Sequence, residues 1–309
     1  MLVQNHMHTA LAASITRSAS PQTYLIIRLL VTPARQPDAF RSYAYFRWLD
    51  DQLDTDGLPP DERLALIDRE QALLDACSRR APVQVMNENE EMLVELLQAG
   101  NRQDSGLRAY LHSLMRVMRF DAARRGRLIS QAELAAYTQW LAVAVTENLH
   151  YFLCPSMPAP RAAGRYMAVS AAHITHMLRD TFADIQAGYF NIPREALQAG
   201  RIAACDVHSD AYRSWVRERV LLARQQFSAG RRYLMSCRSL RLRAAVCSYA
   251  ARFEAVLAAI EADGFRLREH YAVSAGLRGV LRMGWAALAS TLWPASPSPR
   301  EALSPPDLP

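Results

Sequence analysis

"YAYFRWLDDQLD", residues 43–54, places two tyrosines, an arginine, a glutamine and three acids in a run that is otherwise apolar. Residues spaced i, i+4, i+7 and i+11 share one continuous face of an α-helix. In this run those positions hold Tyr43, Arg47, Asp50 and Asp54. Polar residues therefore occupy the stripe on which a buried helix would carry core residues.

The composition of the whole chain predicts an all-α protein. Glycine is scarce, with 12 in 309 residues, and half of the residues are hydrophobic. Ala, Leu and Arg dominate, and no alternating Val/Ile/Thr-rich segment suggests a strand. Helical patterns cover 36–54, 131–153, 160–188 and 276–291, among others.

The breaks between these patterns are too short for interdomain linkers, so we expect one helical domain. It would span residues 20–292, after a flexible N-terminus over residues 1–19. The Pro/Ser-rich segment over residues 293–309 is expected to be a disordered tail.

The net charge of +6 comes from arginines spread over many segments. Without lysine-rich runs or interleaved aromatic residues, this distribution argues against nucleic-acid binding and suits a small anionic substrate. The 5 cysteines are odd in number and form no C-x-x-C pair, which argues against a disulfide framework and a structural zinc site.

We expect a cytoplasmic protein, because the N-terminus lacks the basic region of a secretory signal. No stretch reaches the roughly 20 apolar residues of a transmembrane helix. The least polar stretch, residues 273–293, is interrupted by Arg278 and Arg282 and is expected to form a buried helix or an interfacial one. The second alternative would give peripheral membrane contact.

A second acidic pattern lies in "HITHMLRDTFADIQAGYFNIP", residues 173–193. Helical spacing of i, i+3, i+7 and i+11 again defines one polar stripe. It holds His173, His176, Asp180 and Asp184. Each stripe has an arginine beside its first acid, since Arg47 precedes Asp50 by three residues and Arg179 directly precedes Asp180.

Two such helices across one cavity would bring four carboxylates together, and these could stay ionised only beside cations. Mg²⁺ is commonly held by a few carboxylates, waters and substrate phosphates. The pattern therefore predicts a diphosphate bound through Mg²⁺, with the arginines completing the neutralisation. A single D-x-x-x-D is usually a solvated helix face, but two of them, each beside an arginine in an apolar helix, favour a functional site.

The two motifs resemble those of the squalene/phytoene synthase family, the head-to-head branch of the trans-isoprenyl diphosphate synthases. The first family motif has the form Y-x-x-x-R-x-x-D-x-x-x-D, and the second is L-R-D-x-x-x-D followed by a glycine and a nearby proline. The second is matched by Leu178, Arg179, Asp180, Asp184, Gly188 and Pro193. The stretch "YLIIRLL" is similar to the family's first helix, and "MRFDAARRGRLISQAELAAYT" is similar to a family segment that contains Asp121 and Tyr137. The resemblance covers about residues 20 to 275.

This resemblance implies a single-domain, all-α isoprenoid synthase fold with a large central cavity. It implies a prenyl diphosphate substrate, a second small-molecule acceptor and Mg²⁺ as cofactor. Members that reduce their cyclopropyl intermediate also use NADPH, but no nucleotide-binding motif is visible here. The acids Asp50, Asp54, Asp180 and Asp184 would be catalytic and would ligate the metal. The diphosphate-binding set would be Tyr43, Arg47, Arg179, His173, His176, Tyr137 and Asp121.

The sequence departs from the family pattern at several positions. Where members usually read V-A-G-x-V-G, this chain reads "LAVAVT", so Val143 and Thr146 replace glycines and would narrow the cavity wall. His173 and His176 stand where the family has amides, and Asn191 stands where it has a tyrosine. The N-terminal loop "SASPQTY" lacks the usual basic residue. These changes fall mainly on features associated with the second prenyl diphosphate.

Several functions stay open on these residues. Head-to-head condensation agrees with the overall similarity, whereas prenyl transfer to an aromatic acceptor agrees with the lost glycines and the non-basic loop. An inactive assembly factor would be expected to lose motif acids, and all of them are present. Glu147 and His150 form one E-x-x-H of the di-iron type, but such a bundle needs two. His173 and His176 are expected to line the cavity, and one could serve as a base.

Overall fold

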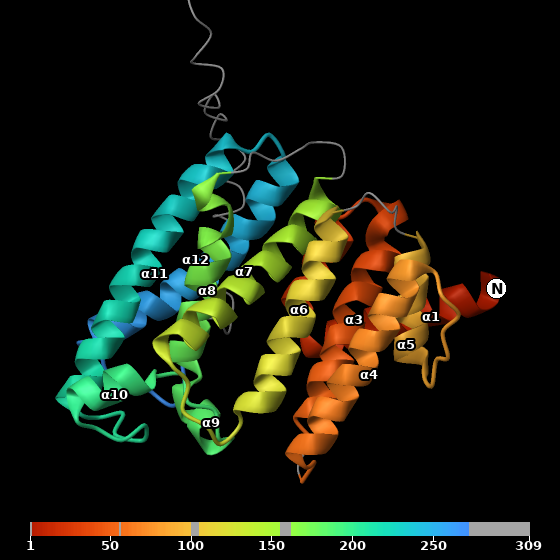
Figure 1. Ribbon diagram of the computed structural model, residues 1–309. Coiled ribbons are helices and arrows are strands. Elements are labelled where there is room, and N and C mark those ends of the chain that lie inside the picture. Colours follow the sequence, from red (N-terminus) through yellow and green to blue (C-terminus); the bar gives the residue numbers. More distant parts are fainter. Residues whose placement is uncertain (1, 56, 100–104, 155–161, 272–309) are drawn as a thin grey trace, which may run out of the picture. The chain divides into compact units, whose positions relative to one another are not determined.

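The computed structural model describes residues 2–55, 57–99, 105–154 and 162–271 (Figure 1). These residues form α-helices, short 3-10 helices and connecting turns, with no β-strand among them. The all-α fold is therefore confirmed. The chain divides into two compact units: unit 1 comprises residues 1–125 and 143–153, and unit 2 comprises residues 126–142 and 154–309.

Unit 1 is built around α3 (Gln36–Leu53), which packs against four other helices. These are α1 (Leu2–Ala19), α2 (Pro21–Leu30), α5 (Glu88–Ala99) and α6 (Ser105–Arg124). The helix α4 (Pro60–Arg79) lies beside α5 and α6 (Figure 1). The second half of α7 (Gln131–Leu153) also belongs to unit 1, and the 3-10 helix η1 (Pro33–Arg35) leads into α3.

The structure forms the helix α1 in place of the flexible segment expected over residues 1–19. Its side chains at His8, Ala12 and Thr16 recur every four residues and are all buried. Because this stripe packs against α3, tertiary contacts stabilise a segment whose sequence alone has no strong amphipathic pattern. The imidazole of His8 adds polar contacts to α5, at 2.9 Å from Glu95 Oε1 and 3.1 Å from Glu91 Oε2.

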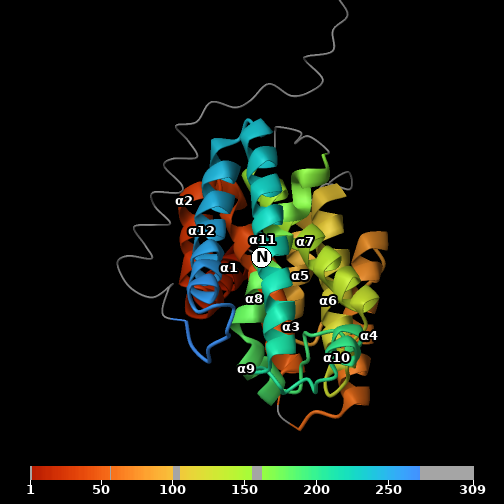
Figure 2. The ribbon, with the colours of Figure 1, turned by 90° about the vertical axis from the view of Figure 1, so that its left-hand side faces the viewer.

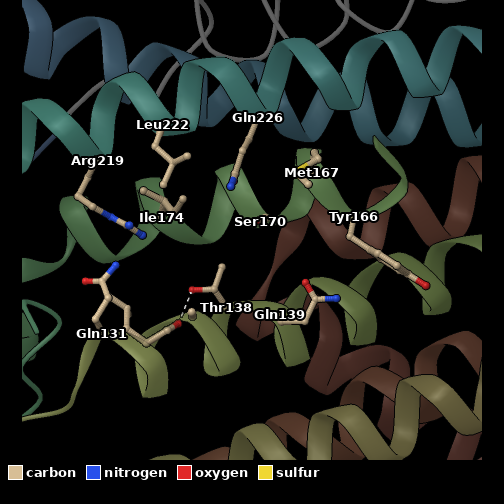
Figure 3. A pocket seen from close by; sticks show the side chains of 12 residues that line it. Gln131, Thr138, Gln139, Tyr166, Met167, Ser170, Ile174, Arg219, Leu222 and Gln226 are labelled. Atoms are coloured by element: carbon tan, nitrogen blue, oxygen red, sulfur yellow. Dashed lines mark hydrogen bonds between the residues drawn. The ribbon is translucent and has the colours of Figure 1, made fainter. Parts of the chain in front are cut away.

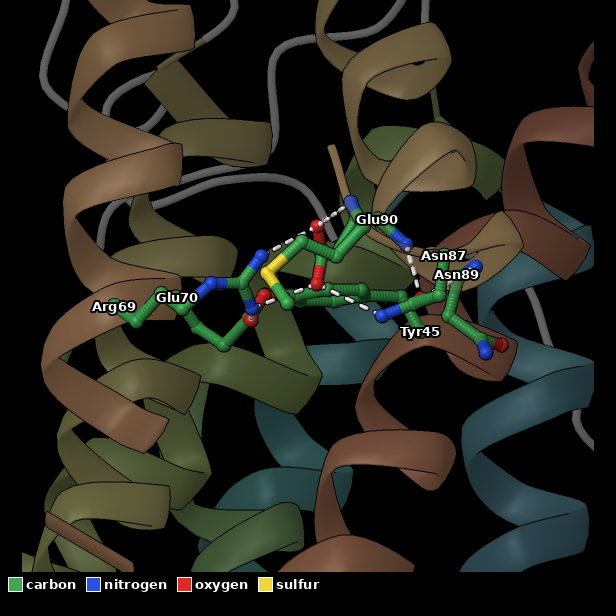
Figure 4. A network of polar contacts seen from close by, with 7 residues as sticks. Tyr45, Arg69, Glu70, Asn87, Asn89 and Glu90 are labelled. Carbon is green, nitrogen blue, oxygen red and sulfur yellow. Dashed lines mark hydrogen bonds and ion pairs between the residues drawn. The ribbon is translucent and has the colours of Figure 1, made fainter. Parts of the chain in front are cut away.

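A buried polar network ties α3, α4 and α5 together inside unit 1 (Figure 4). Glu70 and Glu90 are both 0% exposed. The Tyr45 hydroxyl donates to Glu70 at 2.9 Å, and Arg69 donates to Glu70 at 2.6 Å. Arg69 also donates two bonds of 2.7 Å to Glu90, which additionally accepts from the Met86 N–H at 2.7 Å. The network therefore compensates the burial of two carboxylates with one arginine and several neutral donors.

Unit 2 surrounds α8 (Met167–Arg179) with α11 (Asp210–Ser236) and α12 (Leu240–Ala262), which lie side by side in Figure 2. Most side chains of α8 are buried. Ser209 and Ser239 cap the two long helices, because their side chains accept from the N–H groups three residues on. The unit also contains η2 (Ala163–Tyr166), α9 (Thr181–Gln186), α10 (Arg194–Gly200) and the first half of α7.

Close packing of α11 on α8 depends on Gly230. A Cβ atom built at this position would lie 2.5 Å from the Ala168 backbone nitrogen and 2.7 Å from the Ala168 Cβ. At these distances the added atom would overlap Ala168, so the two helices would have to move apart. The glycine is thus required by the contact between helices and not by its own backbone conformation.

Gly230→Ala is expected to lower the free energy of unfolding by ~1–3 kcal/mol, because overpacking displaces backbone that cannot yield locally. Urea denaturation followed by circular dichroism measures this. Gly106→Ala is the matched control, since its Cβ would meet neighbours only at 3.7 Å or more. Equal losses of unfolding free energy in the two variants would show that the close contact between α8 and α11 at Gly230 does not limit stability.

The helix expected over residues 276–291 and the tail expected over residues 293–309 lie outside the described residues. In the part of the chain that the structure does describe, no helix has the length and apolar character needed to cross a membrane.

Candidate active site

The first acidic motif lies on the last turns of α3 in unit 1. The helix ends where Asp54 becomes its C-cap, with the Asp54 N–H donating to the Asp50 carbonyl at 3.0 Å. Arg63, which is buried, satisfies another carbonyl at this end by donating from Nε to Leu53 O at 2.9 Å. The ordered helix end therefore fixes both acids of the motif relative to each other.

Asp50 sits in an excess of negative charge. Burial and the neighbouring carboxylates of Asp54 and Asp121 raise the pKa of Asp50 to about 6, against the opposing effect of Arg47. The Arg47 Nη1 atom lies 3.3 Å from Asp50, but the same guanidinium also pairs with Asp51. One arginine therefore serves several acids, and the cluster would gain from a further cation.

Asp121, on α6, lies close enough to this cluster for its charge to act on Asp50. It accepts a hydrogen bond from Arg124 Nε at 2.6 Å. Because its charge still contributes to the raised pKa of Asp50, Arg124 does not isolate it from the motif. The structure thus brings Asp50, Asp54 and Asp121 together within unit 1.

Tyr43 completes the first motif one helical turn before Arg47. Burial raises the pKa of the Tyr43 hydroxyl, and a hydrogen bond with the Ser20 side chain acts in the opposite direction. Ser20 also caps α2, accepting from the Thr23 N–H at 3.2 Å. The sequence pattern did not single out Ser20, although its place directly before Pro21 was the signal that it would be fixed at a helix start.

The second motif lies at a break between two helices of unit 2, which differs from the continuous helix expected over residues 160–188. The helix α8 ends at Arg179, Asp180 has φ −100° and ψ 9°, and α9 begins at Thr181. The Thr181 hydroxyl donates to the Met177 carbonyl at 2.9 Å, a local bond that competes with the regular helix ladder. The Asp184 N–H still donates to the Asp180 carbonyl at 2.8 Å, so the two acids remain one turn apart.

Asp180 is neutralised by its own neighbours. Arg179 donates to both of its oxygens at 2.6 Å, and the His176 Nε2 atom lies 2.7 Å from Asp180 Oδ2. Burial acts to raise the pKa of Asp180, but the hydrogen bonds from Arg179 and His176 outweigh it and hold that pKa well below its usual range. The two motifs therefore differ electrostatically, since the first has an excess of acid and the second is internally paired.

Asp184 accepts a hydrogen bond from Asn191 Nδ2 at 2.7 Å. Asn191 is buried and stands where the family resemblance implied a tyrosine. The sequence marked this position as a departure but did not reveal that it would contact the motif. The contact requires the turn after α9 to fold back, which helical periodicity cannot show.

The two histidines of the second stripe have different surroundings. His173 is 5% exposed and packs edge-on against Tyr137, with the ring centroids 4.9 Å apart. The side chain of His176 is 51% exposed and pairs with Asp180. The structure therefore brings His173 to Tyr137 and His176 to the carboxylate, all within unit 2.

Val143 and Thr146 lie on the half of α7 that belongs to unit 1. Thr146 is 5% exposed, and its hydroxyl has no hydrogen-bond partner among the described residues. A buried hydroxyl without a partner costs free energy, so this position is suited to a polar group supplied from outside the chain.

The side chains of the two motifs can be compared with the ligands that a metal ion requires. Over the described ranges, no group of three or more His, Cys, Asp or Glu side chains converges on one metal position. The acids around Asp50 nevertheless fit a hard divalent cation, because they offer oxygen donors and carry uncompensated charge. Asp180 would need to exchange its present donors for a metal.

The sequence and the fold are each similar to those of known proteins. Residues 16–278 match a family model described as squalene/phytoene synthase. The fold is similar to that of squalene synthase HpnC from Alicyclobacillus acidocaldarius, with a TM-score of 0.68, 18% identity, and coverage of 86% of this chain and 97% of that chain. It is also similar to a dehydrosqualene synthase solved with a ligand, with a TM-score of 0.69, 16% identity, and coverage of 92% and 97%. A search of curated proteins found no match.

Identities of this size between structures show the fold alone, whereas the family model extends over both acidic motifs. On that match, the chain belongs to the squalene/phytoene synthase family.

Proposed function

We propose that this protein is a Mg²⁺-dependent prenyltransferase that ionises an allylic prenyl diphosphate and joins it head to head to a second one. The observation that carries the proposal is the carboxylate cluster at Asp50, where Asp54 and Asp121 add negative charge that Arg47 does not balance. Such a cluster is costly unless a cation binds there, and a cation with free ligand positions can hold a diphosphate.

Asp50 and Asp54 would hold Mg²⁺ in unit 1, and Asp180 and Asp184 are the candidate metal ligands of unit 2. When bound, the metal would neutralise charge developing on the leaving diphosphate. Arg47 beside the first motif and Arg179 beside the second are the cations that would add hydrogen bonds to a diphosphate. Asp180 now accepts hydrogen bonds from Arg179 and His176. If Asp180 binds a cation instead, these two donors become available to the diphosphate.

A second candidate, prenyl transfer to a different acceptor such as an aromatic ring, is favoured by the observation at Thr146. Its buried hydroxyl stands where the family carries a glycine, and it has no partner among the described residues. A hydrocarbon chain cannot satisfy that hydroxyl, whereas an acceptor with a phenol or carbonyl can. The third alternative, an inactive assembly factor, is disfavoured because all four motif acids are retained.

The proposed function is tested by incubating the protein with farnesyl or geranylgeranyl diphosphate and Mg²⁺, with and without NADPH. Released diphosphate and the masses of the products are then measured. Head-to-head condensation predicts a C30 or C40 hydrocarbon from a single substrate. Diphosphate release that becomes productive only when cell extract supplies an acceptor would favour the second candidate, and no release under either condition would contradict both.

Removing the side chains of Val143 and Thr146 should distinguish head-to-head condensation from prenyl transfer to a different acceptor. We expect Val143→Gly combined with Thr146→Gly to increase head-to-head condensation, or to create it where the parent shows none, because the lost side chains would leave room for a second prenyl chain. The readout is the yield of C30 or C40 product per enzyme.

Val145→Gly is the matched control for that variant, because it adds backbone freedom at a neighbouring position off this face of α7. A parent that already makes the hydrocarbon efficiently, together with a double variant that makes no more, would show that these side chains do not limit the space.

A further inference from the structure

A separate pocket of about 250 Å³ lies within unit 2, bounded by α7, α8 and α11 (Figure 3). On α8 it is lined by Ser170 and Ile174, and neither His173 nor His176 belongs to its lining. Its volume is just below the roughly 300–1,000 Å³ typical of small-molecule sites, so a ligand here would be small. The acidic motifs contribute no side chain to its lining.

One end of the pocket is cationic. Arg219 of α11 and Gln131 of α7 extend toward each other there (Figure 3). No carboxylate of the described chain pairs with Arg219, and burial alone lowers the pKa of its guanidinium. By contrast, Arg224 of the same helix pairs with Glu261 at 2.6 Å. A partly buried guanidinium without an acid is an incomplete site for an anion.

The far part of the pocket holds a second unsatisfied group. The Gln226 Oε1 atom is buried and accepts no hydrogen bond from any described residue. Gln226 follows Arg219 by seven residues on the same helix, which places the two side chains ~10 Å apart along its axis. Between them lie apolar side chains, chiefly Leu222 and Ile174 (Figure 3).

We infer that this pocket binds an amphiphilic monocarboxylate whose acid group pairs with Arg219, whose aliphatic body lies against Leu222 and Ile174, and whose far end forms a hydrogen bond with the Gln226 amide. Each part of this ligand meets a requirement of the lining: a charge for the arginine, apolar surface for the middle and a polar group for the amide of Gln226. A diphosphate does not fit, because it carries more negative charge than one guanidinium can offset. The inference is therefore independent of the proposed prenyltransferase function.

Isothermal titration calorimetry of the full chain with ω-hydroxyoctanoate tests the site, because an extended molecule of this probe has a length comparable to the distance from Arg219 to Gln226. Octanoate lacks the terminal donor, and octanediol lacks the acid. We expect saturable one-to-one binding of ω-hydroxyoctanoate. Each analogue lacks one polar group of the probe and should bind about tenfold more weakly or worse, because the loss of one hydrogen bond to a charged or buried polar group lowers affinity by this factor.

Variants then assign each end of the ligand. Arg219→Gln should weaken ω-hydroxyoctanoate at least about tenfold, whereas Arg217→Gln, which removes an exposed charge two residues away on α11, should leave it unchanged. Gln226→Leu should remove the preference for ω-hydroxyoctanoate over octanoate without abolishing octanoate binding.

Ala135→Phe, which adds bulk at the pocket lining on α7, should block the probe by volume and does not depend on the folding of the Arg219 variant. Binding that persists in Arg219→Gln and Ala135→Phe, equal binding of octanediol, or no saturable binding would each overturn the inference. Diphosphate release from prenyl diphosphates is measured in parallel, and it should be present in Arg219→Gln whether or not the pocket binds the probe.

Discussion

Asp50→Asn and Asp180→Asn should each lower the rate of diphosphate release from a prenyl diphosphate by ~100-fold or more, in line with the loss of one preorganised charge-stabilising group. Asp50 contributes to a cluster whose charge calls for a cation, and Asp180 holds Arg179 and His176 beside the second motif. Each substitution keeps the shape of the side chain and removes its charge, so the effect should fall on the reaction. Released diphosphate is quantified at saturating Mg²⁺.

Folding is checked on the same samples by circular dichroism, in which both variants should keep the helical signal. Asp61→Asn is the control, because Asp61 is exposed on the first turn of α4 and lies outside both motifs. Full turnover in Asp50→Asn and Asp180→Asn would refute the assignment of the two motifs. A loss of equal size in Asp61→Asn would show that any change of charge perturbs the enzyme.

Glu90→Ala should cause the largest loss of stability, ~3–5 kcal/mol, because it leaves the Met86 N–H and the Asn87 amide without their buried acceptor and Arg69 with Glu70 alone. Glu90 accepts two bonds of 2.7 Å from Arg69 and further bonds from the Met86 N–H and Asn87 Nδ2 (Figure 4). Burial acts to raise the pKa of Glu90, but these hydrogen bonds outweigh it and lower that pKa. The free energy of unfolding in urea at neutral pH measures the effect.

Glu70→Gln is the matched contrast in the same network. Burial is the main reason that the pKa of Glu70 is raised. A carboxyl with a raised pKa stabilises the fold most below its ordinary pKa, and this contribution is lost as the pH rises through the raised value. At neutral pH, the glutamine side chain of the variant keeps an acceptor for Tyr45 without the cost of a buried charge, so Glu70→Gln should change stability by less than ~1 kcal/mol.

Equal losses in Glu90→Ala and Glu70→Gln would show that the two carboxylates are equivalent in the network, contrary to the opposite directions of their pKa shifts. The difference between wild type and Glu70→Gln should also shrink on acidification, as Glu70 becomes protonated.

Helical periodicity was sufficient to predict two of the helices that carry candidate site residues. The pattern over 36–54 corresponds to α3 (Gln36–Leu53), and the pattern over 131–153 corresponds to α7 (Gln131–Leu153). The spacing of polar residues within one helix is a local property, because 3.6 residues per turn fixes which side chains share a face. For the same reason, Tyr43, Arg47 and Asp50 could be assigned to one stripe in advance.

Local periodicity failed where packing or a turn overrides it. The stripe of the second motif is interrupted at Asp180, where the Thr181 hydroxyl bonds to a carbonyl of α8. The N-terminal segment, expected to be flexible, is held as α1 by the burial of Ala12 and Thr16 against α3.

The amino-acid sequence alone determined the helical class, the family and the chemical types present in both motifs, since each depends on residue identity and spacing along one helix. Only the tertiary structure determined which charges are compensated. It places Asp121 of α6 near Asp50 of α3, and it pairs Asp180 with Arg179 and His176 while Asn191 binds Asp184. The physical reason is that a carboxylate's protonation and its capacity for a cation depend on burial and on charges within a few ångströms, and residues far apart in sequence supply many of those charges.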